Sequence, residues 1–155
     1  MGSDSDLPVV EKATAILKEF KVPYECHIYS AHRTPKEAAD FAKKARENDF
    51  GAIICFAGMA AHLAGAVAAN TTLPVIAVPC KGGAMDGLDA LLSSVQMPSG
   101  IPVATVALNG GANAALLAIQ ILAVTNKGLA EKLADKRAKD AKAVLKKDAD
   151  IASKL

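Results

Sequence analysis

The stretch SAHRTP, from Ser30 to Pro35, places a histidine directly beside an arginine. It follows a short apolar segment, YECHIY, and precedes a segment with helical spacing, KEAADFAKKA. A neutral imidazole can accept and return a proton near pH 7, and a guanidinium binds phosphate or carboxylate through a rigid pair of N–H donors. His32 and Arg33 therefore predict an acid–base group next to an anion-binding group. A plain polar loop is the alternative interpretation.

Loops of glycine and other small residues follow the later apolar runs. They read AGMAAHLAG after 51–56, CKGGAMDG after 74–79 and LNGGAN after 102–107. Loops that follow parallel strands gather at one edge of a sheet, where ligands bind, and glycine lets backbone N–H groups approach an anion at a helix start. We therefore expect these loops and SAHR to converge on a small anionic ligand. His62 is then a candidate for lining the pocket, whereas His27, inside an apolar segment, is expected to be structural.

The chain opens with a loop of the same kind, MGSDSDLPVV. One interpretation makes Ser5 or Asp6 the N-cap of the helix that contains Pro8. In the other, Ser3 and backbone N–H groups hold a phosphate, while the Asp6 carboxylate accepts ribose hydroxyls. A ligand-binding loop of this kind normally follows a strand, so we expect that the opening strand of the domain is missing from the sequence.

Helical and strand patterns alternate along the chain. Apolar runs without polar interruption indicate strands that are covered on both faces. The expected strands are 24–29, 51–56, 74–79 and 102–108, and the expected helices are 8–20, 35–47, 59–70, 86–96 and 111–125. This βαβα order predicts an α/β fold, a three-layer α/β/α sandwich with a parallel sheet.

The sequence divides into a catalytic α/β domain, residues 1–128, and a long charged C-terminal helix, residues 129–155. The helix carries a sparse apolar stripe and is either a solvated surface helix or an arm that packs on a neighbouring subunit. The segment GANAALLAIQILAV is apolar nearly all round, so it requires cover on every side. We therefore expect a homo-oligomer with residues 129–155 as its arm.

Composition argues against several classes of function. A net charge of +2 with two Tyr, four Phe and no Trp does not fit the basic, aromatic-rich surface of a nucleic-acid-binding protein. No apolar run reaches the roughly 18 residues of a membrane span, and Cys26, Cys55 and Cys80 stand singly, as in a reducing compartment. No metal-ligand spacing, Walker loop, nucleophile elbow or full dinucleotide fingerprint occurs. We expect a cytoplasmic protein that uses no metal and no cofactor.

The motifs MGSDSD, SAHRTP, AGMAAHLAG and GLDALLSSVQMPSGIPVATVAL resemble the PurE family of de novo purine biosynthesis, in family order and up to about residue 135. The resemblance implies a flavodoxin-like fold, a homo-octamer and a ribonucleotide substrate. It implies an isomerase, a mutase that interconverts N5-carboxyaminoimidazole ribonucleotide and 4-carboxy-5-aminoimidazole ribonucleotide, with His32 as the catalytic acid–base group. The substrate-binding residues implied by the same resemblance are Ser3, Asp6, Ser30, Arg33, Gly58 and His62.

The sequence also departs from the family pattern. The family opens with an apolar strand before MGSDSD, and four positions near the expected pocket differ, namely Met59, Ala64, Gly82 and Ala90. Another branch of the family carboxylates aminoimidazole ribonucleotide directly with CO2. Arg33 and the AAHL motif favour the mutase, since the direct carboxylases resemble SAHKT and lack the second histidine.

Two functions outside the family are the remaining alternatives. A non-catalytic nucleotide-binding module could use the same fold, but it would not need an acid–base histidine beside an anion-binding arginine. A phosphoacceptor receiver domain would need an aspartate at the end of a later strand, and the expected strands end without one.

Overall fold

The sheet at the centre of the fold is built from the apolar runs. In the computed structural model, which describes residues 1–154, β1 (Ile53–Gly58), β2 (Val75–Cys80) and β3 (Ala104–Thr105) lie parallel in the order β1-β2-β3. Every residue of β2 is buried, as expected for a strand that is covered on both faces. Two of the expected strands, 51–56 and 74–79, are thereby confirmed within two residues, whereas 102–108 is reduced to a two-residue strand.

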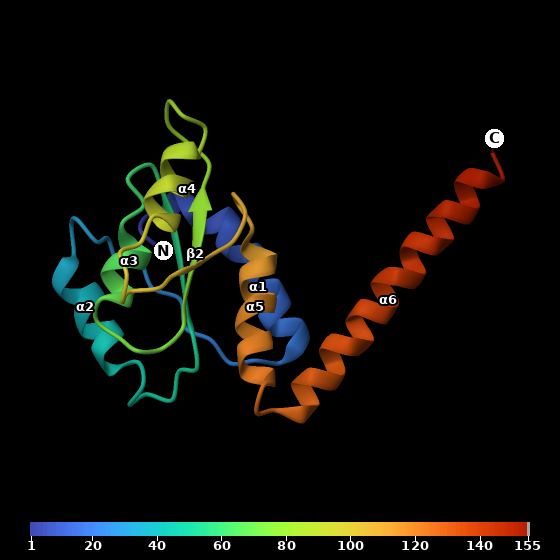
Figure 1. Cartoon of the computed structure of the whole chain (residues 1–155), viewed down its shortest axis with the longest axis horizontal. Coiled ribbons are helices and arrows are strands. Elements are labelled where there is room, and N and C mark those ends of the chain that lie inside the picture. The colour runs from blue at the N-terminus through green and yellow to red at the C-terminus, as the bar shows by residue number, and fades with distance from the viewer. Residues whose placement is uncertain (155) are drawn as a thin grey trace.

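Helices cover the two faces of this sheet (Figure 1). The helices are η1 (Asp4–Asp6), α1 (Leu7–Phe20), α2 (Pro35–Lys44), α3 (Leu63–Ala68), α4 (Leu88–Val95) and α5 (Gly111–Ala123). Helices α1 and α5 pack with Ile76 and Val78, whereas α2 and α3 pack with Val75 and Ala77. Since successive residues of β2 point to opposite faces, these two core clusters lie on opposite sides of the sheet. The expected three-layer arrangement is confirmed.

Residues 24–29 are extended but do not form a strand, so this expectation was wrong. The segment is largely exposed, with Ile28 at 55%. A strand exists only where a neighbouring strand completes its ladder of hydrogen bonds. Among the described residues, the backbone of this segment pairs only with Met1, which donates to the His27 carbonyl (2.8 Å) and accepts from the Tyr29 N–H (2.9 Å).

A gap in the plane of the sheet explains why this segment has no further partner. Met1 bonds to 24–29 on one side, and Gly2 donates to the Phe56 carbonyl of β1 on the other (2.9 Å). Behind these two residues lies a cavity of about 590 Å³, lined by side chains of both helical layers, among them Leu17 and Phe41. Protein interiors rarely contain voids much larger than a water molecule. Among residues 1–154, only Met1 and Gly2 therefore bridge the backbones of β1 and of this segment.

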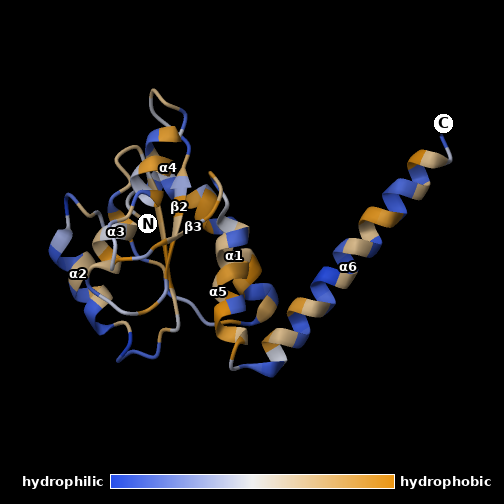
Figure 2. Ribbon diagram, viewed as in Figure 1, coloured by the Kyte–Doolittle hydropathy of each residue, from blue (hydrophilic) through white to orange (hydrophobic). Residues whose placement is uncertain are grey.

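The long C-terminal helix expected from the sequence is confirmed as α6 (Lys127–Ala152), which projects away from the rest of the molecule (Figure 1). Asn126 caps its start, accepting the Leu129 N–H at 3.1 Å. Leu129 and Leu133 pack against the core, but no residue of α6 is buried, and orange apolar residues recur along the projecting part (Figure 2). None of the helices within residues 1–154 combines the length and apolar character that crossing a membrane requires.

Candidate active site

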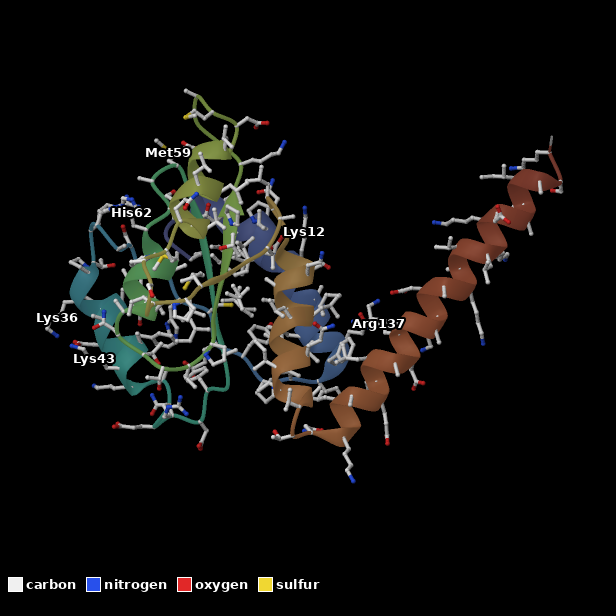
Figure 3. The ribbon with its side chains drawn as sticks, viewed as in Figure 1. Lys12, Lys36, Lys43, Met59, His62 and Arg137 are labelled. Atoms are coloured by element: carbon white, nitrogen blue, oxygen red, sulfur yellow. The ribbon has the colours of Figure 1, made fainter. Side chains whose placement is uncertain are left out.

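The carboxyl ends of β1 and β2 open into the loops 59–62 and 81–87, at the same edge as the N-terminal loop. Met59 and His62 lie together on this side of the molecule, near α3 and α4 (Figure 3). The Cα of Gly58 is close to β2, because a Cβ added there would lie 3.3 Å from the Cys80 carbonyl oxygen. The parallel sheet thus brings the predicted loops to one place, as the sequence indicated.

His32 and His62 meet at this edge although thirty positions separate them in the chain. The His32 Nε2 lies 2.8 Å from the His62 Nδ1, and the rings stand nearly edge to face at 73°. In such a contact one ring nitrogen must donate a proton and the other must accept it. Both side chains are accessible to a ligand, since the contact is exposed. The pair is therefore arranged to hold a proton at an open surface.

Ser30 and Thr34 fix the turn that carries His32 and Arg33. The Ser30 Oγ accepts the backbone N–H groups of His32 (3.3 Å) and Arg33 (3.2 Å), and the Thr34 Oγ1 accepts the Ser30 N–H (2.8 Å). Pro35 then begins α2, where its missing N–H costs no helical hydrogen bond. Ser30 thus supports the two functional residues through the backbone, while its own hydroxyl proton can still be donated to a ligand.

Arg33 reaches back to the N-terminal loop, where its Nη2 donates to the Gly2 carbonyl at 3.4 Å. In that loop Asp6 is the N-cap residue of α1, and Ser3 is the N-cap of η1. Its Oγ accepts the Ser5 N–H at 3.3 Å and so begins η1, whereas Asp6 precedes α1 without a side-chain capping bond. Asp6 thus occupies the N-cap position of the helix that contains Pro8, as one interpretation expected, although its side chain makes no capping bond there.

Asp6 is buried, with 7% of its surface exposed. Burial raises the pKa of its carboxyl above the ordinary value, while the neighbouring Ser3 backbone and Cys80 thiol act in the opposite direction. Burial, aided by the neighbouring Asp6 charge, raises the pKa of Cys80 to about 12. A thiol with such a pKa stays protonated at neutral pH, and the Cys80 thiol donates to the Val78 carbonyl at 3.6 Å. Asp6 and Cys80 are therefore buried neighbours, one just before α1 and the other at the end of β2.

The cavity of about 590 Å³ does not coincide with this group of residues, because His32, Arg33 and His62 are not among its lining residues. Its lining is mainly apolar and lies between the helical layers, which identifies it as unfilled core. We therefore locate the candidate site by its polar groups, at the open edge of the sheet.

Two contacts at this edge were not foreseen in the sequence. The first is the proximity of Cys80 to Asp6. Cys80 ends an apolar run at the ligand edge, and this position in the sequence could have indicated it. Ser93 lies inside a helical pattern, yet its Oγ accepts the Ala61 N–H at 3.2 Å, next to His62. Nothing in the spacing of the sequence indicates this contact.

A family model described as AIR carboxylase matches residues 1–143. An N5-carboxyaminoimidazole ribonucleotide mutase of Pyrococcus horikoshii is 60% identical over 133 residues, which are 86% of this chain and 75% of that protein. A phosphoribosylaminoimidazole carboxylase of Saccharomyces cerevisiae is 58% identical over 122 residues, which are 79% of this chain and 21% of that protein. The crystal structure of Treponema denticola PurE matches with a TM-score of 0.88 and 33% identity, over 96% of this chain and 93% of that one. The chain therefore belongs to the AIR carboxylase family.

Proposed function

We propose that this protein is an N5-carboxyaminoimidazole ribonucleotide mutase, an isomerase of purine biosynthesis that forms 4-carboxy-5-aminoimidazole ribonucleotide. The observation that carries the proposal is the pair of hydrogen-bonded histidines, 2.8 Å apart, at the edge that also carries Arg33 and the N-terminal loop. The 60% identity to the Pyrococcus horikoshii mutase supports it.

The reaction balances with one proton carrier and no external reactant. The bond between the exocyclic nitrogen and its carboxylate breaks, which releases CO2 and leaves a proton to be added to that nitrogen. The C4 carbon of the ring then attacks the CO2, and the proton on C4 must leave. Since one proton is taken up and one is released, a single imidazole can serve both steps. We assign this role to His32, with His62 as its hydrogen-bonding partner.

The remaining residues of the site are assigned to binding. Arg33 is suited to the anionic end of the ribonucleotide, and Ser3 contributes a hydroxyl beside the N–H groups of η1. The Asp6 carboxyl is suited to accept hydrogen bonds from ribose hydroxyls. Ser30 and Gly58 shape the backbone around the ligand. Small-residue loops at 59–62 and 81–87 lie where they can exclude water and retain CO2.

The experiment that tests the function supplies the purified protein with each of two substrates. The mutase is expected to convert N5-carboxyaminoimidazole ribonucleotide without added bicarbonate. The alternative, favoured by the 58% identity to the yeast carboxylase, is direct carboxylation of aminoimidazole ribonucleotide. Conversion of that substrate with bicarbonate, and not of the N5-carboxylated one, would replace the proposal. A non-catalytic nucleotide-binding module would bind a ribonucleotide but convert neither substrate.

Replacing Arg33 by alanine is expected to weaken substrate binding by about ten- to a hundredfold, because a charged hydrogen bond to an anion contributes roughly 1.5–3 kcal/mol. Folding should change little, since the side chain is exposed and makes one long hydrogen bond of 3.4 Å. Isothermal titration with the substrate measures the change. Arg46→Ala is the matched control, because Arg46 bonds to Thr72, outside the site. Equal affinities of the two variants would remove Arg33 from the site.

We also propose that residues 1–128 carry the catalysis and that residues 129–155 act as an arm in a cytoplasmic homo-octamer. The exposed Val144, Leu145 and Ile151 of α6, at 64%, 67% and 58%, support such an arm. Light scattering near neutral pH is expected to give the mass of eight chains. Ending the chain after residue 138 should lower this mass, and a monomer mass for the full chain would contradict the arm.

A further inference from the structure

Ser93 connects α4 to the loop that leads into His62. Its hydroxyl donates to the Asp89 carbonyl within α4 at 2.6 Å, and its oxygen accepts the Ala61 N–H from loop 59–62 at 3.2 Å. The same oxygen lies 3.4 Å from the Met59 carbonyl. One side chain of a packed helix thus contacts the backbone of Met59 and of Ala61, the residue directly before His62.

Loop 59–62 has a conformation that requires such support. Met59 has a φ of 52°, which is unusual for a residue with a side chain. The Ala61 N–H also donates to the Met59 carbonyl (2.9 Å), and the His62 N–H donates to the Ala60 carbonyl (2.8 Å). Each of these two backbone bonds spans just two residues, which marks a tight turn. Backbone in such sparsely populated regions is strained and persists only where neighbouring structure fixes it. The hydrogen bond from Ala61 to Ser93 fixes the loop to α4, and Ala61 itself is buried, with 2% of its surface exposed.

His62 depends on this loop for its position. It is the N-cap residue of α3 and makes no side-chain capping bond there. Its Nδ1 faces the His32 Nε2 instead, at 2.8 Å. The distance between the two rings is therefore set on one side by the turn at 30–34 and on the other by the loop that Ser93 holds.

We propose that Ser93 is a positioning residue that keeps His62 within hydrogen-bonding distance of His32. The expected effect of Ser93 on turnover rests on the proposed function. Its effect on the contact between His32 and His62 does not depend on that function. Without the hydroxyl, loop 59–62 loses its bond to α4, and His62 no longer holds one orientation. Proton transfer at His32 is therefore slowed, whereas binding by the groups assigned to the phosphate and ribose is unchanged.

Ser94 provides a matched control in the same helix. Ser94 is more deeply buried than Ser93, with 3% of its surface exposed, and its Oγ donates to the Ala90 carbonyl at 2.8 Å. Among the described residues, its hydroxyl makes no hydrogen bond to loop 59–62. Ser94→Ala thus removes a hydroxyl and a bond within α4 but leaves the loop bond in place. A role of Ser93 confined to the stability of α4 would make the two alanine variants alike.

The experiment compares Ser93→Ala, Ser93→Thr and Ser94→Ala in the full chain. The first readout needs no substrate: imidazole 15N shifts at one fixed pH report whether the His32 and His62 nitrogens share a hydrogen bond. We expect Ser93→Ala to lose this signature, Ser94→Ala to keep it, and Ser93→Thr, which retains a hydroxyl, to restore it. The second readout is turnover, which should fall about tenfold in Ser93→Ala, with KM changed by less than about twofold.

Unchanged histidine shifts in a folded Ser93→Ala variant would overturn the proposal, and so would equal changes in Ser94→Ala. If Ser93→Ala does not fold, Ser93→Cys takes its place, since a thiol has nearly the size of the hydroxyl but accepts hydrogen bonds only weakly. A weakened histidine signature in Ser93→Cys supports the positioning role, and an unchanged one overturns it. Failure of the proposed function is distinguishable, because it would leave the wild-type protein without turnover while the shifts still report on Ser93.

Discussion

Replacing His32 by asparagine is expected to lower turnover by about a hundredfold or more, while nucleotide affinity stays within a few-fold. Asparagine keeps the approximate shape and some hydrogen bonding of the imidazole but cannot carry the proton between the exocyclic nitrogen and C4. The binding groups, Arg33 and the N-terminal loop, remain in place. Steady-state rates combined with binding titrations of the unreactive variant separate the two effects.

His27→Asn is the matched control for this experiment. The His27 ring lies outside the site, bonded to Glu25 at 3.1 Å and stacked on Tyr29. Its replacement should leave turnover within about threefold. Near-normal turnover in His32→Asn would show that another group moves the proton, and His62, the hydrogen-bonding partner of His32, would be the next candidate.

A chain that carries about six apolar residues before Met1 is expected to unfold at a markedly higher temperature. Such a strand would continue the pairing of Met1 and Gly2 and fill the cavity of about 590 Å³ between the helical layers. Burial contributes about 2 kcal/mol per side chain, ordering costs about 1–2 kcal/mol per residue, and each backbone hydrogen bond adds about 1 kcal/mol. The added strand is thus expected to gain several kcal/mol in total, and each kcal/mol raises the Tm of a chain of this size by about 2–4 °C.

The control is an extension of the same length made of glycine and serine, which cannot fill an apolar cavity. Differential scanning calorimetry compares the two extended proteins with the original chain. Amide exchange gives a second measurement, since the N–H groups of His27 and Phe56 should become protected only with the apolar extension. Equal melting temperatures for the two extensions would mean that the cavity does not accept a strand.

Much of the fold and the location of the candidate site could be predicted from the sequence. The apolar runs at 51–56 and 74–79 identified β1 and β2, because a strand buried on both faces tolerates no polar interruption. Parallel strands end at one edge, so the order of the loops sufficed to bring His32 and His62 to the same side. Residue types then suggested the chemistry, since an exposed histidine beside an arginine suits proton transfer next to an anion.

The expectation for residues 24–29 failed for a physical reason. Their pattern is that of a strand, but a strand forms only where a neighbouring backbone completes its hydrogen bonds. Among the described residues, only Met1 and Gly2 lie beside this segment in the plane of the sheet. Local propensity cannot supply the missing partner. The bounds of β3 changed in the same way, because only Ala104 and Thr105 find register partners, on β2.

Tertiary structure alone decided the contacts on which the proposed chemistry depends. The 2.8 Å approach of His32 to His62 joins a turn before α2 to a loop after β1, and its length depends on the packing of α4 through Ser93. The burial of Asp6 against Cys80 likewise depends on how α1 meets the end of β2. The sequence determined which groups reach this edge, since strand order follows from local patterns. Distances and burial between those groups arise only when separate elements pack together.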